Sequence, residues 1–222
     1  MGLIVAARYT WPLMRTPSSK LPAGGLYAIS DGPRVDLLQA CEAALRGGAA
    51  MLQYRDKSSD AARRRAEASM LVAMCARLGV PLIINDDCEL AAAVGAAGVH
   101  LGEHDGDVAA ARARLGDAAI IGVSCYDSLE TARQLTAAGA DYLAFGAFFP
   151  SPTKPNARRA QAQLLRSART LALPLVAIGG ITPENAPSLL EAGADFVAAI
   201  AGVFANGDTE AAARRYATLF TR

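Results

Sequence analysis

Eight short apolar runs, separated by longer segments with Arg and Glu at helical spacing, constrain the fold of this chain most strongly. They are rich in Ile, Val, Leu and Ala and cover residues 26–30, 51–55, 82–85, 98–101, 120–124, 142–146, 175–179 and 196–200. Parallel strands that are buried on both faces have such continuous apolar sequences, and helices connect them in repeated βα units. The pattern therefore predicts eight parallel strands that alternate with helices.

A weak internal repeat supports this count. A Gly-Ala pair precedes each even-numbered run, starting at Gly48, Gly95, Gly139 and Gly193, with spacings of 47, 44 and 54 residues. Glycine is the usual residue where a helix ends in a left-handed conformation. Two βα units per period, repeated four times, are what a (β/α)₈ TIM barrel requires. The alternative is a doubly wound open sheet, which is disfavoured because no G-x-G-x-x-G turn follows the first run.

The chain of 222 residues, 52% of them hydrophobic, can build one large core. We predict a single (β/α)₈ barrel catalytic domain over residues 26–222, preceded by an extension over residues 1–25. The extension lacks the features of a secretory signal and becomes rich in Pro, Ser and Gly. We expect it to be partly disordered or to form a short helix on the outside of the barrel.

Charge and cysteine content exclude several classes of function. The 22 Lys and Arg residues balance 21 Asp and Glu, so the net charge of +1 indicates no binding to nucleic acid or to an anionic membrane. No segment is long and apolar enough to span a bilayer. The four cysteines form no Cys-x-x-Cys pair, which favours reduced thiols and a cytoplasmic location. The sequence leaves the oligomeric state open, and a homo-oligomer is one expectation.

A polar cluster, Asn85-Asp86-Asp87, follows the third apolar run. Carboxylates at the mouth of a core need a cation, hydrogen bonds or solvent to offset their desolvation, so the cluster is a candidate metal or catalytic site. The alternative is a turn followed by a helix N-cap, because Asn and Asp are also common at these two places. Taken alone, the cluster leaves both interpretations open.

The ends of the other runs favour the metal site, because active sites of barrels lie at the C-terminal ends of the strands. Three cations, Arg55, Lys57 and Lys154, and a second carboxylate, Asp105, would join Asp86 there. Magnesium binds one or two protein carboxylates together with phosphate oxygens, while Lys and Arg neutralise the remaining charge. The combination predicts a site for a polyphosphate held with a divalent metal ion.

A second phosphate site is expected after the seventh and eighth runs. Gly179-Gly180 and Ala201-Gly202 are turns of small residues that can bring backbone N–H groups close to a phosphate. The alternative is that the glycines only permit tight turns. Because both turns are present, we favour a phosphate.

The two histidines receive no catalytic role. His100 lies within the fourth run, where a hydrogen-bonded core histidine is expected. His104 lies in the following loop and could approach a ligand, but no nucleophile is paired with it.

Seven segments between about Leu26 and Phe204 resemble the thiamine phosphate synthase family, also called thiamine-phosphate pyrophosphorylase. In order they are LYAISD, LQYRDK, LIINDD, GVHLGEHD, IIGVS, GADYLAFGAFFPSPTK and VAIGGITPEN. The resemblance implies a (β/α)₈ fold and a transferase that depends on Mg²⁺. Its two small-molecule substrates would be 4-amino-2-methyl-5-hydroxymethylpyrimidine diphosphate and 4-methyl-5-(2-phosphooxyethyl)thiazole, and its products thiamine phosphate and diphosphate.

The resemblance also implies roles for the residues that match the family's motifs. Asp86 and Asp105 become the Mg²⁺ ligands. The catalytic residues become Arg55, Lys57, Ser124 and Lys154. The resemblance and the polar segments at the strand ends together predict these substrate contacts: Gln53, Tyr54, Arg55, Asp56, Lys57, Asn85, Ser124, Ser151, Pro152, Thr153, Lys154, Gly179, Gly180, Ile200 and Ala201. Tyr54, Asp56, Pro152 and Gly179 are included because they lie within those strand-end segments.

Within this set, the pyrimidine diphosphate is implied to lie against Gln53, Arg55, Lys57, Asn85, Ser124 and Lys154. The thiazole phosphate is implied to lie against Ser151, Thr153, Gly180 and the backbone of Ile200 and Ala201. Ala201 stands where the family commonly has Ser, which keeps a backbone N–H but loses a hydroxyl. Ser151 stands where Thr is common and keeps the hydroxyl.

The family mechanism is dissociative: diphosphate leaves first, and the thiazole nitrogen then captures a pyrimidine-methyl cation. One rival function is a thiazole tautomerase of the same superfamily, which has no use for a diphosphate or its metal. Another is a non-catalytic barrel that binds a phosphate ligand. The presence of Arg55, Lys57, Asp86, Asp105 and Lys154 argues against the tautomerase.

Overall fold

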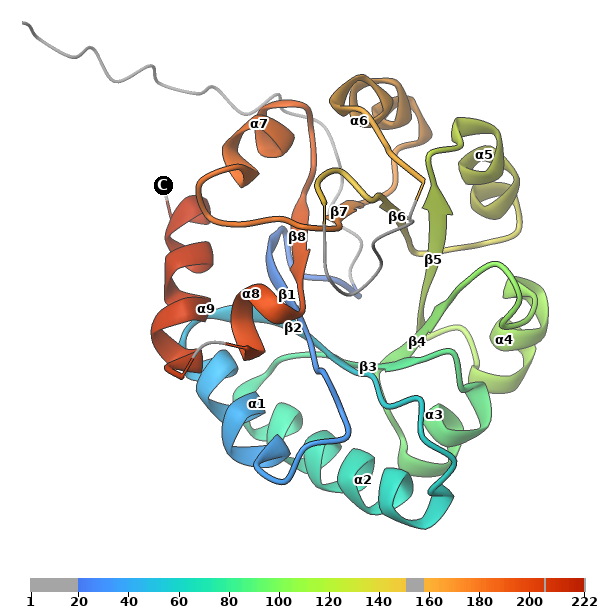
Figure 1. Ribbon diagram of the computed structural model, residues 1–222. Helices are drawn as coiled ribbons and strands as arrows, with labels where there is room; N and C mark the ends of the chain where they lie inside the picture. Colours follow the sequence, from blue (N-terminus) through green and yellow to red (C-terminus); the bar gives the residue numbers. More distant parts are fainter. Residues whose placement is uncertain (1–19, 151–157, 206, 222) are drawn as a thin grey trace, which may run out of the picture.

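Eight parallel strands form a closed barrel in the computed structural model, which describes residues 20–150, 158–205 and 207–221 (Figure 1). The strands are β1 (Gly25–Ile29), β2 (Ala49–Tyr54), β3 (Leu82–Asn85), β4 (Gly98–Leu101), β5 (Ile120–Tyr126), β6 (Tyr142–Phe145), β7 (Leu175–Ile178) and β8 (Phe196–Ala199). Each strand pairs with its neighbours in sequence, and β8 closes the barrel onto β1. All eight predicted strands and the TIM barrel are confirmed, with strand ends within two residues of the prediction.

The helices surround the barrel (Figure 1). They are α1 (Leu37–Arg46), α2 (Ala61–Leu78), α3 (Cys88–Val94), α4 (Val108–Leu115), α5 (Leu129–Ala137), α6 (Ala162–Ala168), α7 (Ala186–Glu191), α8 (Ala201–Phe204) and α9 (Thr209–Ala217). Short 3₁₀ turns follow α6 and α9, at Arg169–Leu171 and Thr218–Phe220. None of the helices in the described part of the chain is long and apolar enough to cross a membrane.

Local sequence explains where many helices begin and end. Side chains of Asp60, Asp87 and Ser128 accept hydrogen bonds from backbone N–H groups in the first turns of α2, α3 and α5, which stabilises those helix starts. The four repeat glycines all have positive φ angles, between 67° and 108°. Such angles are readily adopted only by glycine, so the Gly-Ala repeat has the backbone role that the sequence predicts.

The hydrophobic core has two parts, as the alternation of side chains in a closed barrel requires. Inside the barrel lie side chains that include Tyr27, Met51, Ile83, Tyr142 and Phe196. A larger cluster lies between the strands and the helices. Strand residues therefore contribute alternately to an inner core and to an outer one, and the inner one forms the floor beneath the strand ends.

The described end of the predicted extension lies against the barrel. Leu21 is buried in the inner core, and Lys20 forms an ion pair with Asp141 at 3.0 Å. Gly25 is the first residue of β1. Residues 20–25 thus belong to the barrel, because Leu21 covers apolar side chains inside it, whereas the expectation for residues 1–19 falls outside the described residues.

Candidate active site

A cavity of about 520 Å³ opens at the C-terminal ends of the strands. Every strand of the barrel contributes at least one lining residue. Nine of the predicted site residues line it: Gln53, Arg55, Lys57, Asn85, Asp86, Asp105, Ser124, Gly179 and Ile200. The fold therefore brings together side chains that are up to 147 positions apart in the sequence.

One side of the cavity, which we call the charged wall, is formed by Arg55, Lys57, Asp86 and Asp105 from the ends of β2, β3 and β4. The Lys57 ammonium lies 3.0 Å from Asp86 Oδ2. Asp86 has a φ angle of +64°, a left-handed conformation that is uncommon for residues other than glycine and for which Asp and Asn are enriched. Its backbone N–H donates a hydrogen bond to His100 O at 2.8 Å, which fixes this turn against β4.

The two carboxyl groups of the charged wall are in contact. Burial raises the pKa of Asp105, and the hydrogen bond and negative charge of Asp86 raise it further. Asp105 Oδ2 also accepts a hydrogen bond from the Gly102 backbone N–H at 3.0 Å. Two neighbouring carboxylates of this kind are an oxygen donor set suited to a divalent cation.

Asp87, the third member of the polar cluster, has a different role. Its Oδ1 accepts a hydrogen bond from the Leu90 backbone N–H at 2.8 Å and caps α3, while its Oδ2 pairs with Arg64 at 2.9 Å. Both interpretations of the Asn85-Asp86-Asp87 cluster thus apply, to different residues. Asp87 is a helix cap, and Asn85 and Asp86 line the cavity.

The opposite side of the cavity is apolar, and we call it the apolar wall. It is formed by Ala144, Val176, Ile178, Ala198 and Ile200 from β6, β7 and β8. Members of this wall lie two positions apart along β7 and around the end of β8, as expected for one face of a strand. A flat, apolar ring can pack here without leaving polar groups unpaired.

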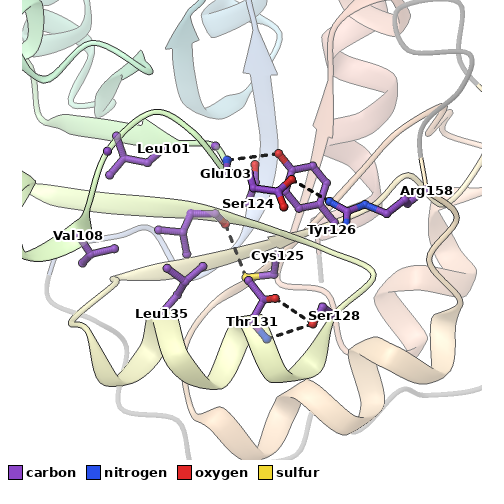
Figure 2. A pocket seen from close by; sticks show the side chains of 13 residues that line it. Leu101, Glu103, Val108, Ser124, Cys125, Tyr126, Ser128, Thr131, Leu135 and Arg158 are labelled. Carbon is purple, nitrogen blue, oxygen red and sulfur yellow. Dashed lines mark hydrogen bonds and ion pairs between the residues drawn. The ribbon is translucent and has the colours of Figure 1, made fainter.

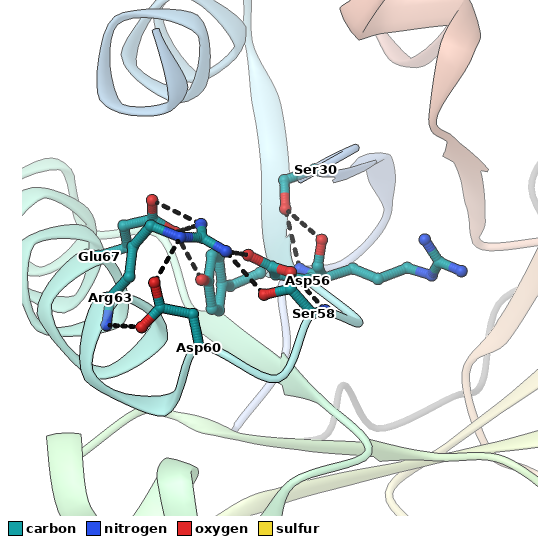
Figure 3. Close-up of polar contacts among 8 residues, drawn as sticks. Ser30, Asp56, Ser58, Asp60, Arg63 and Glu67 are labelled. Atoms are coloured by element: carbon teal, nitrogen blue, oxygen red, sulfur yellow. Dashed lines mark hydrogen bonds and ion pairs between the residues drawn. The ribbon is translucent and has the colours of Figure 1, made fainter. Parts of the chain in front are cut away.

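Tyr54 and Asp56, two of the predicted substrate contacts, point away from the cavity. The Tyr54 hydroxyl donates to Glu67 on α2 at 2.6 Å. The Asp56 side chain is 0% exposed and lies 2.7 Å from the Arg63 guanidinium, which also contacts Glu67 (Figure 3). The physical reason is alternation: Gln53 and Arg55 face the interior of the barrel, so the residues between and after them face the helices.

This network nevertheless supports the charged wall. Burial opposes ionisation of Asp56, but hydrogen bonds from Ser58 and Arg63 outweigh it and hold its pKa below the usual range. Ser30, at the end of β1, accepts a hydrogen bond from the Arg55 backbone N–H at 2.8 Å. The segment that carries Arg55 and Lys57 is therefore fixed on both sides, and Asp56 is a support for the site.

Two further groups of predicted residues are not among the described lining residues, for different reasons. Gly180 and Ala201 are sequence neighbours of the lining residues Gly179 and Ile200. Gly179 and Gly180 have φ angles of 100° and 62°, which explains glycine at both positions. Ser151, Pro152, Thr153 and Lys154 lie outside the described residues.

The chain is similar to known proteins over most of its length. The family described as thiamine monophosphate synthase matches residues 26–203. The thiamine-phosphate synthase of Xanthomonas campestris pv. campestris is 56% identical over 201 residues, which cover 90% of this chain and 97% of the relative. That of Halorhodospira halophila is 54% identical over 199 residues, covering 89% and 95%.

The chain belongs to the thiamine monophosphate synthase family.

A solved structure of a family member has the same fold. The thiamine phosphate pyrophosphorylase from Pyrococcus furiosus superposes with a TM-score of 0.80 at 31% sequence identity, covering 90% of this chain and 95% of that one. The chain is accordingly an enzyme of thiamine biosynthesis, a transferase with thiamine-phosphate synthase activity. The family, the fold and the activity predicted from the sequence are confirmed.

Several lining residues of this family member were not predicted. His100 has a hydrogen-bonded side chain, as expected, but it also lines the cavity, as His104 does.

At the rim, the Arg158 guanidinium lies 4.4 Å from the centre of the Tyr126 ring and pairs with Glu103 at 3.0 Å (Figure 2). Behind Ser124 and Tyr126 lies a smaller cavity of about 150 Å³. Two-residue alternation divides the side chains of each strand into two sets, but the closed barrel decides which set faces the cavity. The Arg158 contact likewise depends on tertiary structure.

Proposed function

We propose that this thiamine-phosphate synthase binds the pyrimidine diphosphate with its diphosphate group on the charged wall and its ring towards the apolar wall. The observation that supports this best is the division of one cavity into a wall with Arg55, Lys57, Asp86 and Asp105 and a wall without charge. A diphosphate needs cations, and an aromatic ring needs apolar contacts. The pyrimidine substrate has both parts in one molecule.

Asp86 and Asp105 would hold Mg²⁺. Their contact and the raised pKa of Asp105 fit this role, because two close carboxylates favour a bound cation. Among the described residues there is no group of three or more His, Cys, Asp or Glu side chains that could hold a metal alone. The remaining ligands would be diphosphate and water oxygens, as is usual for Mg²⁺. When bound, Mg²⁺ neutralises charge on the diphosphate.

The protein's own side chains would assist departure of the diphosphate. The carbon–oxygen bond to the diphosphate breaks, the bonding electrons leave with that oxygen, and the thiazole nitrogen captures the remaining pyrimidine-methyl cation. Arg55 and Lys57, together with Lys154, would stabilise the charge that accumulates on the leaving group. The apolar wall would keep water away from the cation. No general base is needed, because a ring nitrogen already has a free electron pair.

The thiazole phosphate would bind near the ends of β7 and β8. Backbone N–H groups of Gly180, Ile200 and Ala201, with the hydroxyls of Ser151 and Thr153, are the proposed contacts. Positive φ angles at Gly179 and Gly180 support a tight turn that only glycine forms easily. Ala201 offers only its backbone, so we expect weaker thiazole phosphate binding than with Ser at this position.

We place this activity in the cytoplasm. The four cysteines are free, and three of them are buried, which fits a reducing compartment.

The test is an assay of the purified full chain with both substrates, with and without EDTA. We expect thiamine phosphate and diphosphate in equal amounts with Mg²⁺, and loss of both with EDTA. Isomerisation of a thiazole carboxylate phosphate without thiamine phosphate formation would instead support the tautomerase. Tight binding of the substrates with no diphosphate release in any divalent metal would support the non-catalytic barrel.

A further inference from the structure

A chain of hydrogen bonds crosses the floor of the cavity and joins two of the proposed substrate contacts. At one end, Gln53 Nε2 donates to the Tyr27 hydroxyl at 2.7 Å. The Tyr27 and Tyr142 hydroxyls lie 2.9 Å apart. Tyr142 continues the chain to His100 Nδ1 at 2.9 Å, and His100 Nε2 lies 3.0 Å from Ser124 Oγ. Five side chains from β1, β2, β4, β5 and β6 therefore form one polar path through the barrel.

The amide of Gln53 sets the direction of this path. Since Gln53 donates to the Tyr27 oxygen, the Tyr27 hydrogen is available for the Tyr142 oxygen. The Tyr142 hydrogen then goes to Nδ1 of His100, which must accept it without a proton of its own. A neutral imidazole with an unprotonated Nδ1 carries its proton on Nε2 and donates it to Ser124. Ser124 Oγ is thereby an acceptor within the path, and its own hydrogen is left for the cavity.

We propose that His100 is a positioning residue, held as the Nε2–H tautomer by the path from Gln53, and that it fixes the Ser124 hydroxyl as a hydrogen-bond donor towards the substrate. The structural part of this inference concerns the protein alone. Its consequence for the pyrimidine ring rests on the proposed function, because that proposal brings the ring against Gln53 and Ser124.

Burial makes the path rigid. Tyr27 and Tyr142 are at most 1% exposed, and burial, as the largest cause, raises the pKa of both phenols. Each hydroxyl therefore stays protonated and can donate a hydrogen bond to the next group of the path. The Tyr142 ring stacks on His100 and meets Tyr27 edge to face. A side chain at Gly122 would overlap the Tyr142 ring, so glycine there provides the space in which Tyr142 reaches both partners.

If the hydrogen bonds of the path ran in the reverse direction, His100 would carry its proton on the other ring nitrogen, which makes the inference testable. If the Gln53 amide were turned, its carbonyl would accept from Tyr27, and the path would require the proton of His100 on Nδ1. Ser124 would then donate to His100 and present only an acceptor to the cavity. The position of one proton on His100 therefore distinguishes the two arrangements.

The first experiment is ¹⁵N–¹H NMR of the full-length protein labelled at histidine, without substrates, near neutral pH. We expect the His100 proton on Nε2 with a single set of signals. A proton on Nδ1, or on both nitrogens, would overturn the inference. Because no substrate is present, an incorrect substrate assignment would leave this result unaffected.

The second experiment uses Tyr142→Phe, which keeps the ring and removes the hydroxyl. We expect His100 to become a mixture of tautomers, since Nδ1 has lost its donor. Tyr216→Phe is the matched control, because Tyr216 is also buried and its hydroxyl donates to Ile181 O outside the path. It should leave the His100 tautomer unchanged. An unchanged tautomer in Tyr142→Phe as well would contradict the inference.

Kinetics test the consequence for the substrate. In Tyr142→Phe we expect KM for the pyrimidine diphosphate to rise about tenfold, with KM for the thiazole phosphate changed less than about twofold. His100→Gln, whose Nε2 can still donate to Ser124, should recover part of the loss seen in His100→Leu. Equal changes in both KM values, or no difference between Gln and Leu, would show a merely structural role for His100.

Discussion

The charged wall and the apolar wall are built from the same architectural element, the C-terminal ends of barrel strands, but they place their side chains at different depths. Lys57, Asp86 and Asp105 lie just beyond the last strand residues. Val176 and Ile178 lie within β7. Charges that remain near solvent avoid most of the desolvation that a deeper position would require. Depth along the strand therefore separates polar chemistry at the rim from apolar contacts below it.

The two walls also differ in what holds them. The apolar wall is continuous with the inner core of the barrel, because Ala144, Val176 and Ala198 belong to both. The charged wall stands on turns, and these turns are fixed by polar contacts such as the ion pair of Asp56 with Arg63 and the hydrogen bond from the Asp86 backbone N–H to His100 O. Substitutions in the first wall should change packing and water access, and substitutions in the second should change charge with little effect on folding.

The largest effect is expected when the charged wall loses its central carboxylate. Asp86→Asn keeps a side chain that tolerates the positive φ of this position but removes the negative charge. If Asp86 holds Mg²⁺, turnover should fall by about 10²–10³-fold, the size seen when one strong electrostatic contact to a transition state is removed. Steady-state kinetics at saturating Mg²⁺ measure the loss, and the melting temperature reports the fold.

Asp87→Asn is the matched control for this prediction. It changes the adjacent carboxylate to an amide that also caps helices well, so turnover should stay within about twofold of the unsubstituted protein. Near-normal turnover in Asp86→Asn would remove Asp86 from the metal site. An equal loss in both variants would show that the whole turn, and not one ligand, is responsible.

A smaller effect is expected when the apolar wall becomes polar. Ile178→Thr introduces a hydroxyl where the wall should exclude water from the pyrimidine-methyl cation. Placing a hydroxyl in an apolar site without a partner costs about 1–3 kcal/mol. We expect a roughly tenfold lower rate of thiamine phosphate formation and, more specifically, diphosphate release in excess of thiamine phosphate, because water captures part of the cation.

Val197→Thr provides the comparison. Val197 is fully buried in the outer cluster between strands and helices, so its substitution should lower stability without opening the cavity to water. The ratio of diphosphate to thiamine phosphate should stay at one in this variant. A ratio of one in Ile178→Thr as well would show that this part of the apolar wall does not shield the cation.

The sequence was informative about the charged wall because charged residues that follow apolar runs are conspicuous. Arg55, Lys57, Asp86 and Asp105 all line the cavity as the strand-end argument predicts. The same argument included Tyr54 and Asp56, whose side chains face α2. It treated the whole segment as one surface, although side chains alternate between the two faces of a strand and of the extended chain just after it.

The apolar wall and the hydrogen-bonded path could not be predicted from the sequence in the same way. Val176 and Ala198 resemble any buried strand residue, and only the closed barrel distinguishes those that face the cavity from those that face helices. His100 was expected to be hydrogen bonded, but its partners Tyr142 and Ser124 come from strands 42 and 24 positions away. Such contacts depend on the register between strands, which the composition of each strand does not determine.

The smallest predicted effect concerns the repulsion that the charged wall tolerates for its function. Burial and the neighbouring Asp86 raise the pKa of Asp105 in the folded protein, so the folded state binds this proton more tightly than the unfolded chain does. The native state is therefore favoured at low pH, and stability is lost as the pH rises from the unfolded pKa, about 3.9, through the raised folded value. Asp105→Asn removes this loss.

Metal-free Asp105→Asn should consequently be more stable than the unsubstituted protein at neutral pH, by less than about 1 kcal/mol because the site is open to solvent. That corresponds to a rise in melting temperature of at most about 2–4 °C. The difference should disappear near pH 3, where the carboxyl is protonated in both states. Added Mg²⁺ should reverse the order, since it stabilises the protein that keeps both carboxylates. A melting temperature that is lower in Asp105→Asn without metal would mean that Lys57 already compensates the two charges, and that the charged wall is not strained before its cation binds.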